Sequence, residues 1–123
     1  GLSRARLPIT PLAAVRHVGD IAIRMLRKAL DALARLDPVA AAAIVREDFE
    51  IDEEFRSIVR QLITFMMEDP RTISQALEIV WIAKAIERIG DHAKNMAEQV
   101  IYIVKGTDVR HTSVEDLERE ALG

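Results

Sequence analysis

Hydrophobic residues recur every three or four positions along most of this chain, which is the spacing of amphipathic helices. Two Asp-Pro pairs, Asp37-Pro38 and Asp69-Pro70, interrupt the pattern. A residue before proline is biased away from helical geometry, whereas Asp followed by Pro is a common way to begin a helix. Each pair therefore ends one helix close to the start of the next. The pattern predicts helices at about 11–36, 38–68 and 72–105.

Local signals define the remaining helix ends. Thr10-Pro11 predicts an N-cap and a proline in the first turn of the first helix. The segment from Thr72 to Gln75 has the spacing of a capping box at the start of the third helix. Gly106 follows the last apolar repeat, and we expect it to end the third helix.

Short connections decide the arrangement of the three helices. Connections of two or three residues force neighbouring helices to run antiparallel. The fold class we predict is all-α, an antiparallel up-down-up three-helix bundle over residues 10–106. We expect residues 1–9 to be a leader or an expression remnant, and residues 107–123 to be a polar tail with room for a short helix.

Composition narrows the function classes. The 123 residues suffice for one hydrophobic core. There is no cysteine, so disulfides, thiolate zinc sites and cysteine nucleophiles are excluded. A net charge of −3, spread along the chain, argues against a nucleic-acid partner. No apolar run has the length of a membrane span. We therefore expect a cytoplasmic protein without direct membrane insertion.

Two acidic pairs, Asp48 with Asp52 and Glu87 with Asp91, lie at matched distances from the turn at Asp69-Pro70. In straight antiparallel helices, Asp52 and Glu87 would both lie roughly 26 Å from that turn, and Asp48 and Asp91 roughly 32 Å. Four carboxylates at one level repel one another unless a cation lies among them. The spacing therefore predicts a metal site formed by these four residues.

Other interpretations of these acids remain open on the sequence alone. Asp48 projects close to the inward stripe of its helix and Asp52 lies at the edge of that stripe, so Asp48 needs a partner. A salt bridge to Arg24 or Arg27 is as reasonable as a metal ion. Glu87 and Asp91 share one face of their helix with further charged residues. A face of mixed charge is more often simply exposed to solvent. Four apolar residues precede them on that side of the helix and suggest that the bundle packs against something else: Ile73, Leu77, Val80 and Trp81.

The donor atoms on offer are oxygens. Asn95, one turn beyond Asp91, is a further candidate ligand, whereas His92 points away and His17 and His111 lie elsewhere. Carboxylates without thiolate or imidazole favour magnesium, manganese or iron over structural zinc. There is no Ser/His/Asp or glycine-rich phosphate-binding signature, so we predict that the protein is not an enzyme. The alternatives are a carboxylate-bridged metalloenzyme and a structural bundle with salt-bridged acids.

Several segments resemble the PhoU family. Residues 87–95 read ERIGDHAKN, 102–106 read YIVKG, 59–69 read VRQLITFMMED and 46–52 read REDFEID. The first two are similar to the last core helix of the family, and the last to its middle-helix motif. The resemblance extends over about residues 12–111.

The resemblance has implications for fold, metal and partners. It implies a bundle equivalent to the C-terminal one of two similar repeats, and metal motifs at Asp48 with Asp52 and at Glu87 with Asp91. The implied metal is iron first, with manganese, magnesium or zinc as alternatives. It implies a negative regulator of phosphate uptake and phosphate-starvation signalling. The implied partners are the ATPase subunit of the phosphate ABC transporter, the sensor histidine kinase PhoR and, as a further arrangement, a second copy of the chain.

Overall fold

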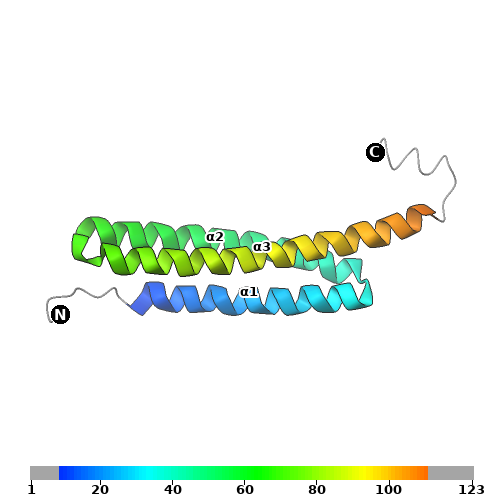
Figure 1. Ribbon diagram of the computed structural model, residues 1–123, viewed down its shortest axis with the longest axis horizontal. Coiled ribbons are helices and arrows are strands. Elements are labelled where there is room, and N and C mark those ends of the chain that lie inside the picture. Colours follow the sequence, from blue (N-terminus) through cyan, green and yellow to red (C-terminus); the bar gives the residue numbers. More distant parts are fainter. Residues whose placement is uncertain (1–8, 111–123) are drawn as a thin grey trace.

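The computed structural model describes residues 9–110, and their side chains from 10 to 106. Three helices, α1 (Ile9–Arg35), α2 (Pro38–Glu68) and α3 (Ile73–Arg110), account for nearly all of them, with a short 3₁₀ turn, η1 (Pro70–Thr72), before α3. Successive helices run in opposite directions. In the view of Figure 1, α2 and α3 overlap and α1 lies below them, in contact with both. Within this part of the chain there is no strand. The predicted all-α three-helix bundle is confirmed.

The connection between α1 and α2 uses Asp37 in two ways. Its backbone N–H donates to the carbonyl of Ala32 at 3.0 Å, and that of Leu36 donates to Leu33 at 3.3 Å. This pair of bonds is a Schellman motif, with Leu36 in the left-handed conformation at φ 50°. The Asp37 carboxylate then accepts from the backbone N–H groups of Val39 and Ala40. Asp37 thus ends one helix and caps the next, as its sequence predicts.

The second connection is held by Asp69 and Thr72. The Asp69 carboxylate accepts from the backbone N–H of Arg71 and from its guanidinium. This pairing lowers the pKa of Asp69. The buried Thr72 hydroxyl, expected to cap α3, donates to the carbonyls of Asp69 at 2.7 Å and Phe65 at 3.2 Å. Thr72 therefore ties the turn to the last residues of α2.

Two predictions of helix ends are wrong. α1 begins at Ile9, so Thr10 lies inside the helix and not before it. α3 continues through Gly106 to Arg110. A glycine ends a helix when its φ becomes positive, and no glycine in the described chain has a positive φ. Residues 1–8 and 111–123, with most of the expected leader and tail, lie outside the described residues.

The core lies along the common axis of the three helices. It consists mainly of large apolar side chains of α2 packed against alanines, valines and a few larger side chains of α1 and α3. The largest fully buried side chains come from all three helices: Met25, Ile44, Ile51, Ile58, Leu62 and Val100. Among the described residues, no helix has the length and apolar character needed to cross a membrane.

Candidate metal site on α2 and α3

Asp48 belongs to the buried stripe of α2. The stripe repeats every three or four residues: Ala41, Ile44, Asp48, Ile51, Phe55, Ile58 and Leu62. Asp48 is only 3% exposed, whereas Asp52, one turn later, is half-buried. The predicted positions of both residues are confirmed. The helix thus directs one carboxylate into an apolar environment, where an unpaired charge is expensive to keep.

Gly90 brings α3 against α2 at this level. A Cβ atom on Gly90 would lie 3.4 Å from Asp48 Oδ1 and 3.5 Å from Ile51 Cδ1. Because glycine carries no side chain, Asp48 packs directly against the backbone of α3. The contact places Asp91, the residue after Gly90, beside Asp48. The register expected from the Asp69-Pro70 turn is therefore present in the fold.

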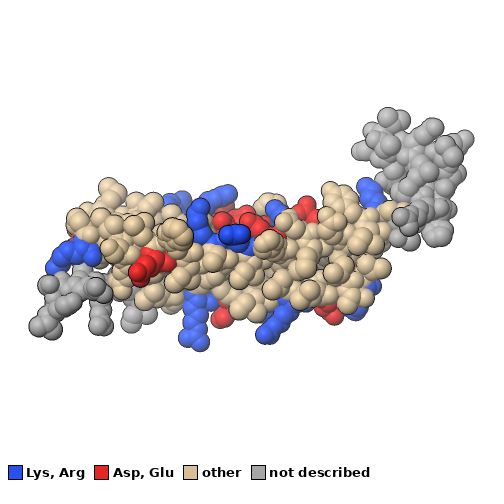
Figure 2. Space-filling view, in the orientation of Figure 1, with Lys and Arg blue, Asp and Glu red and all other residues tan. Residues whose placement is uncertain are grey.

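The structure brings three of the four predicted ligands together. One carboxylate oxygen from each of Asp48, Asp52 and Asp91 lies within 4.8 Å of the others. We call these three residues the acidic group. Glu87 is half-buried and lies outside the group, and Asn95 is exposed. Acidic side chains gather near the middle of the molecule, where α2 and α3 lie together, with basic side chains next to them (Figure 2).

The pKa values of Asp48 and Glu87 are both raised. Burial is the main cause of the raised pKa of Asp48, followed by the charge of Asp52, while Lys94 opposes it. Burial also raises the pKa of Glu87, helped by the charges of Asp91 and Asp52. The negative charges around Asp48 and Glu87 thus favour a positive charge beside these two residues.

The basic partner of Asp48 is Lys94. Its Nζ atom lies 3.7 Å from Asp48 Oδ2, a distance of an ion pair and not of a good hydrogen bond. The expected partners, Arg24 and Arg27, are both exposed on α1, so that prediction is wrong in its choice of residue. The sequence held a signal for Lys94, because it follows Asp91 by three residues and so shares its face of α3.

The second oxygen of Asp48 has no partner. Asp48 Oδ1 is buried and accepts no hydrogen bond. A buried carboxylate oxygen without a partner is unusual in a folded protein and is consistent with a bound ion at this position. The donors beside it are carboxylates, the ligands preferred by magnesium, manganese and other hard cations. The residues present therefore fit a divalent cation.

The histidines lie outside the acidic group. His92 is exposed, as expected. His17 lies on α1, with its Nε2 atom 3.7 Å from Glu54 Oε1. His111 falls outside the described residues. The described acidic group thus has no imidazole beside it to act as a ligand or a base.

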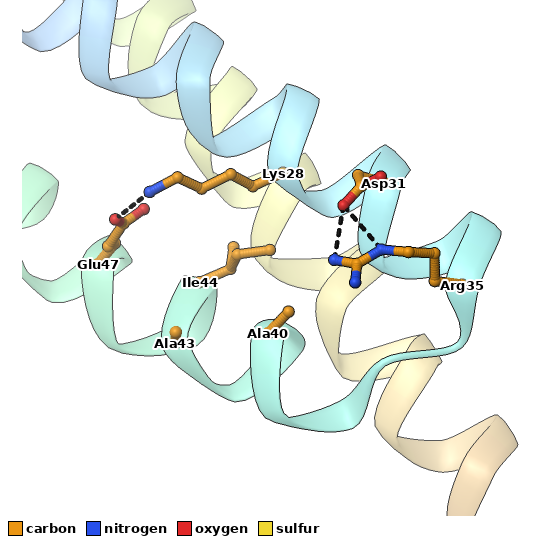
Figure 3. A pocket seen from close by; sticks show the side chains of 7 residues that line it. All are labelled: Lys28, Asp31, Arg35, Ala40, Ala43, Ile44 and Glu47. Atoms are coloured by element: carbon orange, nitrogen blue, oxygen red, sulfur yellow. Dashed lines mark hydrogen bonds and ion pairs between the residues drawn. The ribbon is translucent and has the colours of Figure 1, made fainter.

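A separate hollow lies between α1 and α2 near their connection. Ala40, Ala43 and Ile44 form its apolar side, and the small side chains of the two alanines leave the space open (Figure 3). The charged residues around it pair with one another: Lys28 with Glu47 at 2.7 Å, and Arg35 with Asp31 at 2.7 Å. Because these charges neutralise each other, the hollow offers less to a charged ligand than the acidic group does.

Comparison with known proteins identifies the family. Residues 15–100, which extend over all three helices, match the sequence profile of the PhoU domain. The chain belongs to the PhoU family. The predicted resemblance is confirmed, and the match includes both halves of the candidate metal site.

Named relatives agree with this membership. The chain is 56% identical over 110 residues to a "Phosphate-specific transport system accessory protein PhoU homolog" from Burkholderia sp. It is 45% identical over 112 residues to the "Phosphate-specific transport system accessory protein PhoU" of Escherichia coli (strain K12). These alignments include 89% and 91% of this chain but only 47% and 46% of the relatives. The chain thus spans somewhat less than half the length of these PhoU proteins.

A solved structure gives the same fold. The crystal structure of PhoU from Pseudomonas aeruginosa matches with a TM-score of 0.72 at 48% sequence identity. The match includes 74% of this chain and 44% of that one. The helical bundle described above is therefore a PhoU-family architecture.

Proposed function

We propose that this chain is a regulatory accessory protein of phosphate transport that acts through protein contacts and not as an enzyme. The observation that carries the proposal is its similarity to relatives named phosphate-specific transport system accessory proteins, at 45–56% identity.

The partners we propose follow from the family resemblance. They are the ATPase subunit of the phosphate ABC transporter and the sensor histidine kinase PhoR, and contact with them in the cytoplasm would restrain uptake and starvation signalling. Large apolar side chains on the surface support a role in protein contacts. Trp81 on α3 is 77% exposed, and Leu77 and Ile82 lie beside it. An exposed tryptophan among aliphatic residues is a typical anchor for a partner protein.

The test is direct binding between purified proteins. The chain is immobilised, and the ATPase subunit of the same organism's phosphate transporter is titrated over it by biolayer interferometry. We expect saturable binding that Trp81→Ala weakens by roughly tenfold, a loss typical of an interface anchor. His92→Ala, an exposed change on the same helix, is the matched control and should bind normally. A full-length relative that binds the ATPase and PhoR, while this chain binds neither, would contradict the proposal.

We also propose that Asp48, Asp52, Glu87 and Asp91, with Asn95 as a further ligand, hold a metal. Iron is the first expectation, with manganese, magnesium or zinc as alternatives. The buried, partnerless oxygen of Asp48 supports this proposal, as does the 4.8 Å group that it forms with Asp52 and Asp91. Bound metal would supply the positive charge that allows these carboxylates to remain ionised together. Glu87 would join the ligands by a change of side-chain rotamer.

A further inference from the structure

We propose that Lys94 is an internal competitor for the metal: its ammonium group neutralises the acidic group when no metal is bound, and so limits the affinity for divalent cations. The inference rests on the proposed metal site and assigns a role to a residue outside the ligand set. Lys94 would determine how much free metal is needed to fill the site.

The first support is the position of Lys94. Its Nζ atom lies 3.7 Å from Asp48 Oδ2, at the edge of the group that Asp48 forms with Asp52 and Asp91. The other oxygen, Asp48 Oδ1, is left without a partner. One ammonium group carries a single positive charge against three carboxylates, so the ionised acidic group keeps an excess of negative charge.

The second support is the local balance of charge. Lys94 is the basic residue that pairs with Asp48, and the acids Asp52 and Asp91 lie in the same group. A divalent cation bound by the same carboxylates would lie a few ångströms from the Lys94 ammonium. Two positive charges at that separation repel strongly, so the metal and Lys94 would compete for Asp48.

The third support is that the Lys94 side chain can move into solvent, whereas that of Asp48 is fixed. The Lys94 side chain is 37% exposed, whereas that of Asp48 is 4% exposed. Lysine carries its charge on a flexible four-carbon stem that can carry the ammonium group into water. Asp48 is fixed by the packing of α2 against Gly90. Metal binding would therefore displace Lys94 towards solvent without rearranging the core.

The experiment measures Mn²⁺ binding to the metal-free chain by isothermal titration calorimetry, with the electron paramagnetic resonance signal of free Mn²⁺ as a second readout. Lys94→Met removes the charge and keeps an unbranched side chain. We expect it to bind Mn²⁺ on the order of tenfold more tightly than the wild type. Lys94→Arg, which keeps the charge, should stay close to the wild type. Lys105→Met, which removes one positive charge from an exposed position further along the same helix, is the matched control.

The metal-free stability provides an independent readout. Lys94→Met should melt at a lower temperature than the wild type in EDTA, and saturating Mn²⁺ should raise its melting temperature by more. If Lys94→Met does not fold, the same comparison is made with Lys94→Gln. Lys94→Met binding no more tightly than Lys105→Met, while the wild type binds Mn²⁺, would overturn this inference alone. No Mn²⁺ binding by the wild type or by either Lys94 variant would overturn the metal site as well.

Discussion

Asp48 is the residue on which the proposed metal site depends. It lies among aliphatic residues on the buried face of α2, where an ionised carboxylate is normally paired. One of its oxygens faces the Lys94 ammonium, and the other has no partner. Burial and the neighbouring acids raise its pKa. A cation beside Asp48 would therefore offset the cost of burying its negative charge.

Gly90 sets the distance between Asp48 and α3, and we predict that Gly90→Leu destabilises the bundle. The Cβ atom alone would lie 3.4 Å from Asp48 Oδ1, so the rest of a leucine side chain has no space. Overpacking of this kind lowers the free energy of unfolding by about 1–3 kcal/mol. The measurement is urea denaturation followed by circular dichroism in EDTA.

Gly106→Leu is the matched control, in the same helix. A Cβ atom there meets nothing within 4 Å, and leucine has the higher helix propensity. Gly106→Leu should therefore leave the free energy of unfolding unchanged or raise it. Equal urea midpoints for Gly90→Leu and the wild type would show that the close approach of α2 and α3 at Gly90 is unimportant for stability.

At the scale of the helices, the sequence predicts most of the fold. The two Asp-Pro pairs mark both connections, and the start of α2 at Pro38 and its end at Glu68 agree with the expected boundaries. These signals work because they are local: proline restricts its neighbours and aspartate caps the next turn. The prediction that Gly106 ends α3 is wrong, because a glycine permits a helix to end but does not require it. The helix continues to Arg110.

The end of α1 is not predictable in the same way. Leu36 adopts φ 50°, a conformation that usually belongs to glycine or asparagine. A leucine at this position therefore does not predict the Schellman motif that the structure contains. The hydrogen bonds from Leu36 and Asp37 back to α1, together with the cap at Asp37, impose the conformation on it.

We predict that Leu36→Gly stabilises the protein. A left-handed conformation costs a non-glycine residue roughly 1–2 kcal/mol, and the greater freedom of an unfolded glycine offsets part of that gain. Leu36 is 47% exposed, and the loss of its covered apolar surface offsets a further part of the gain. The net gain should be about 0.5 kcal/mol, measured as a rise in the urea midpoint.

Leu30→Gly is the control for this change. Leu30 is exposed in the interior of α1, where glycine should destabilise by about 1 kcal/mol. If both substitutions lower the urea midpoint, the conformation of Leu36 is not a source of strain in the native state.

For the molecule as a whole, the turn at Asp69-Pro70 determines which residues of α2 and α3 meet. That geometry allows a sequence to predict that Asp48, Asp52 and Asp91 come together, because both helices are regular and the turn is short. It does not determine side-chain rotamers, and Glu87 consequently lies outside the group. Lys94 could have been predicted from the same register, because it lies one turn after Asp91 on the same face of α3.

Several large apolar side chains are exposed on the surface of the molecule. Trp81, Tyr102, Phe49 and Met67 are all more than 60% exposed. Large exposed apolar side chains of this kind are typical of surfaces that contact other proteins.

The most direct test of the proposed metal centre is native mass spectrometry of the purified protein, with elemental analysis of the same sample. The wild type and the double variant Asp48→Asn, Asp91→Asn are both reconstituted with Fe²⁺ or Mn²⁺. We predict metal in the wild type and none in the variant, with the same circular dichroism spectrum for both. Metal retained at full stoichiometry in the variant, or absent from the reconstituted wild type, would contradict a metal site formed by α2 and α3.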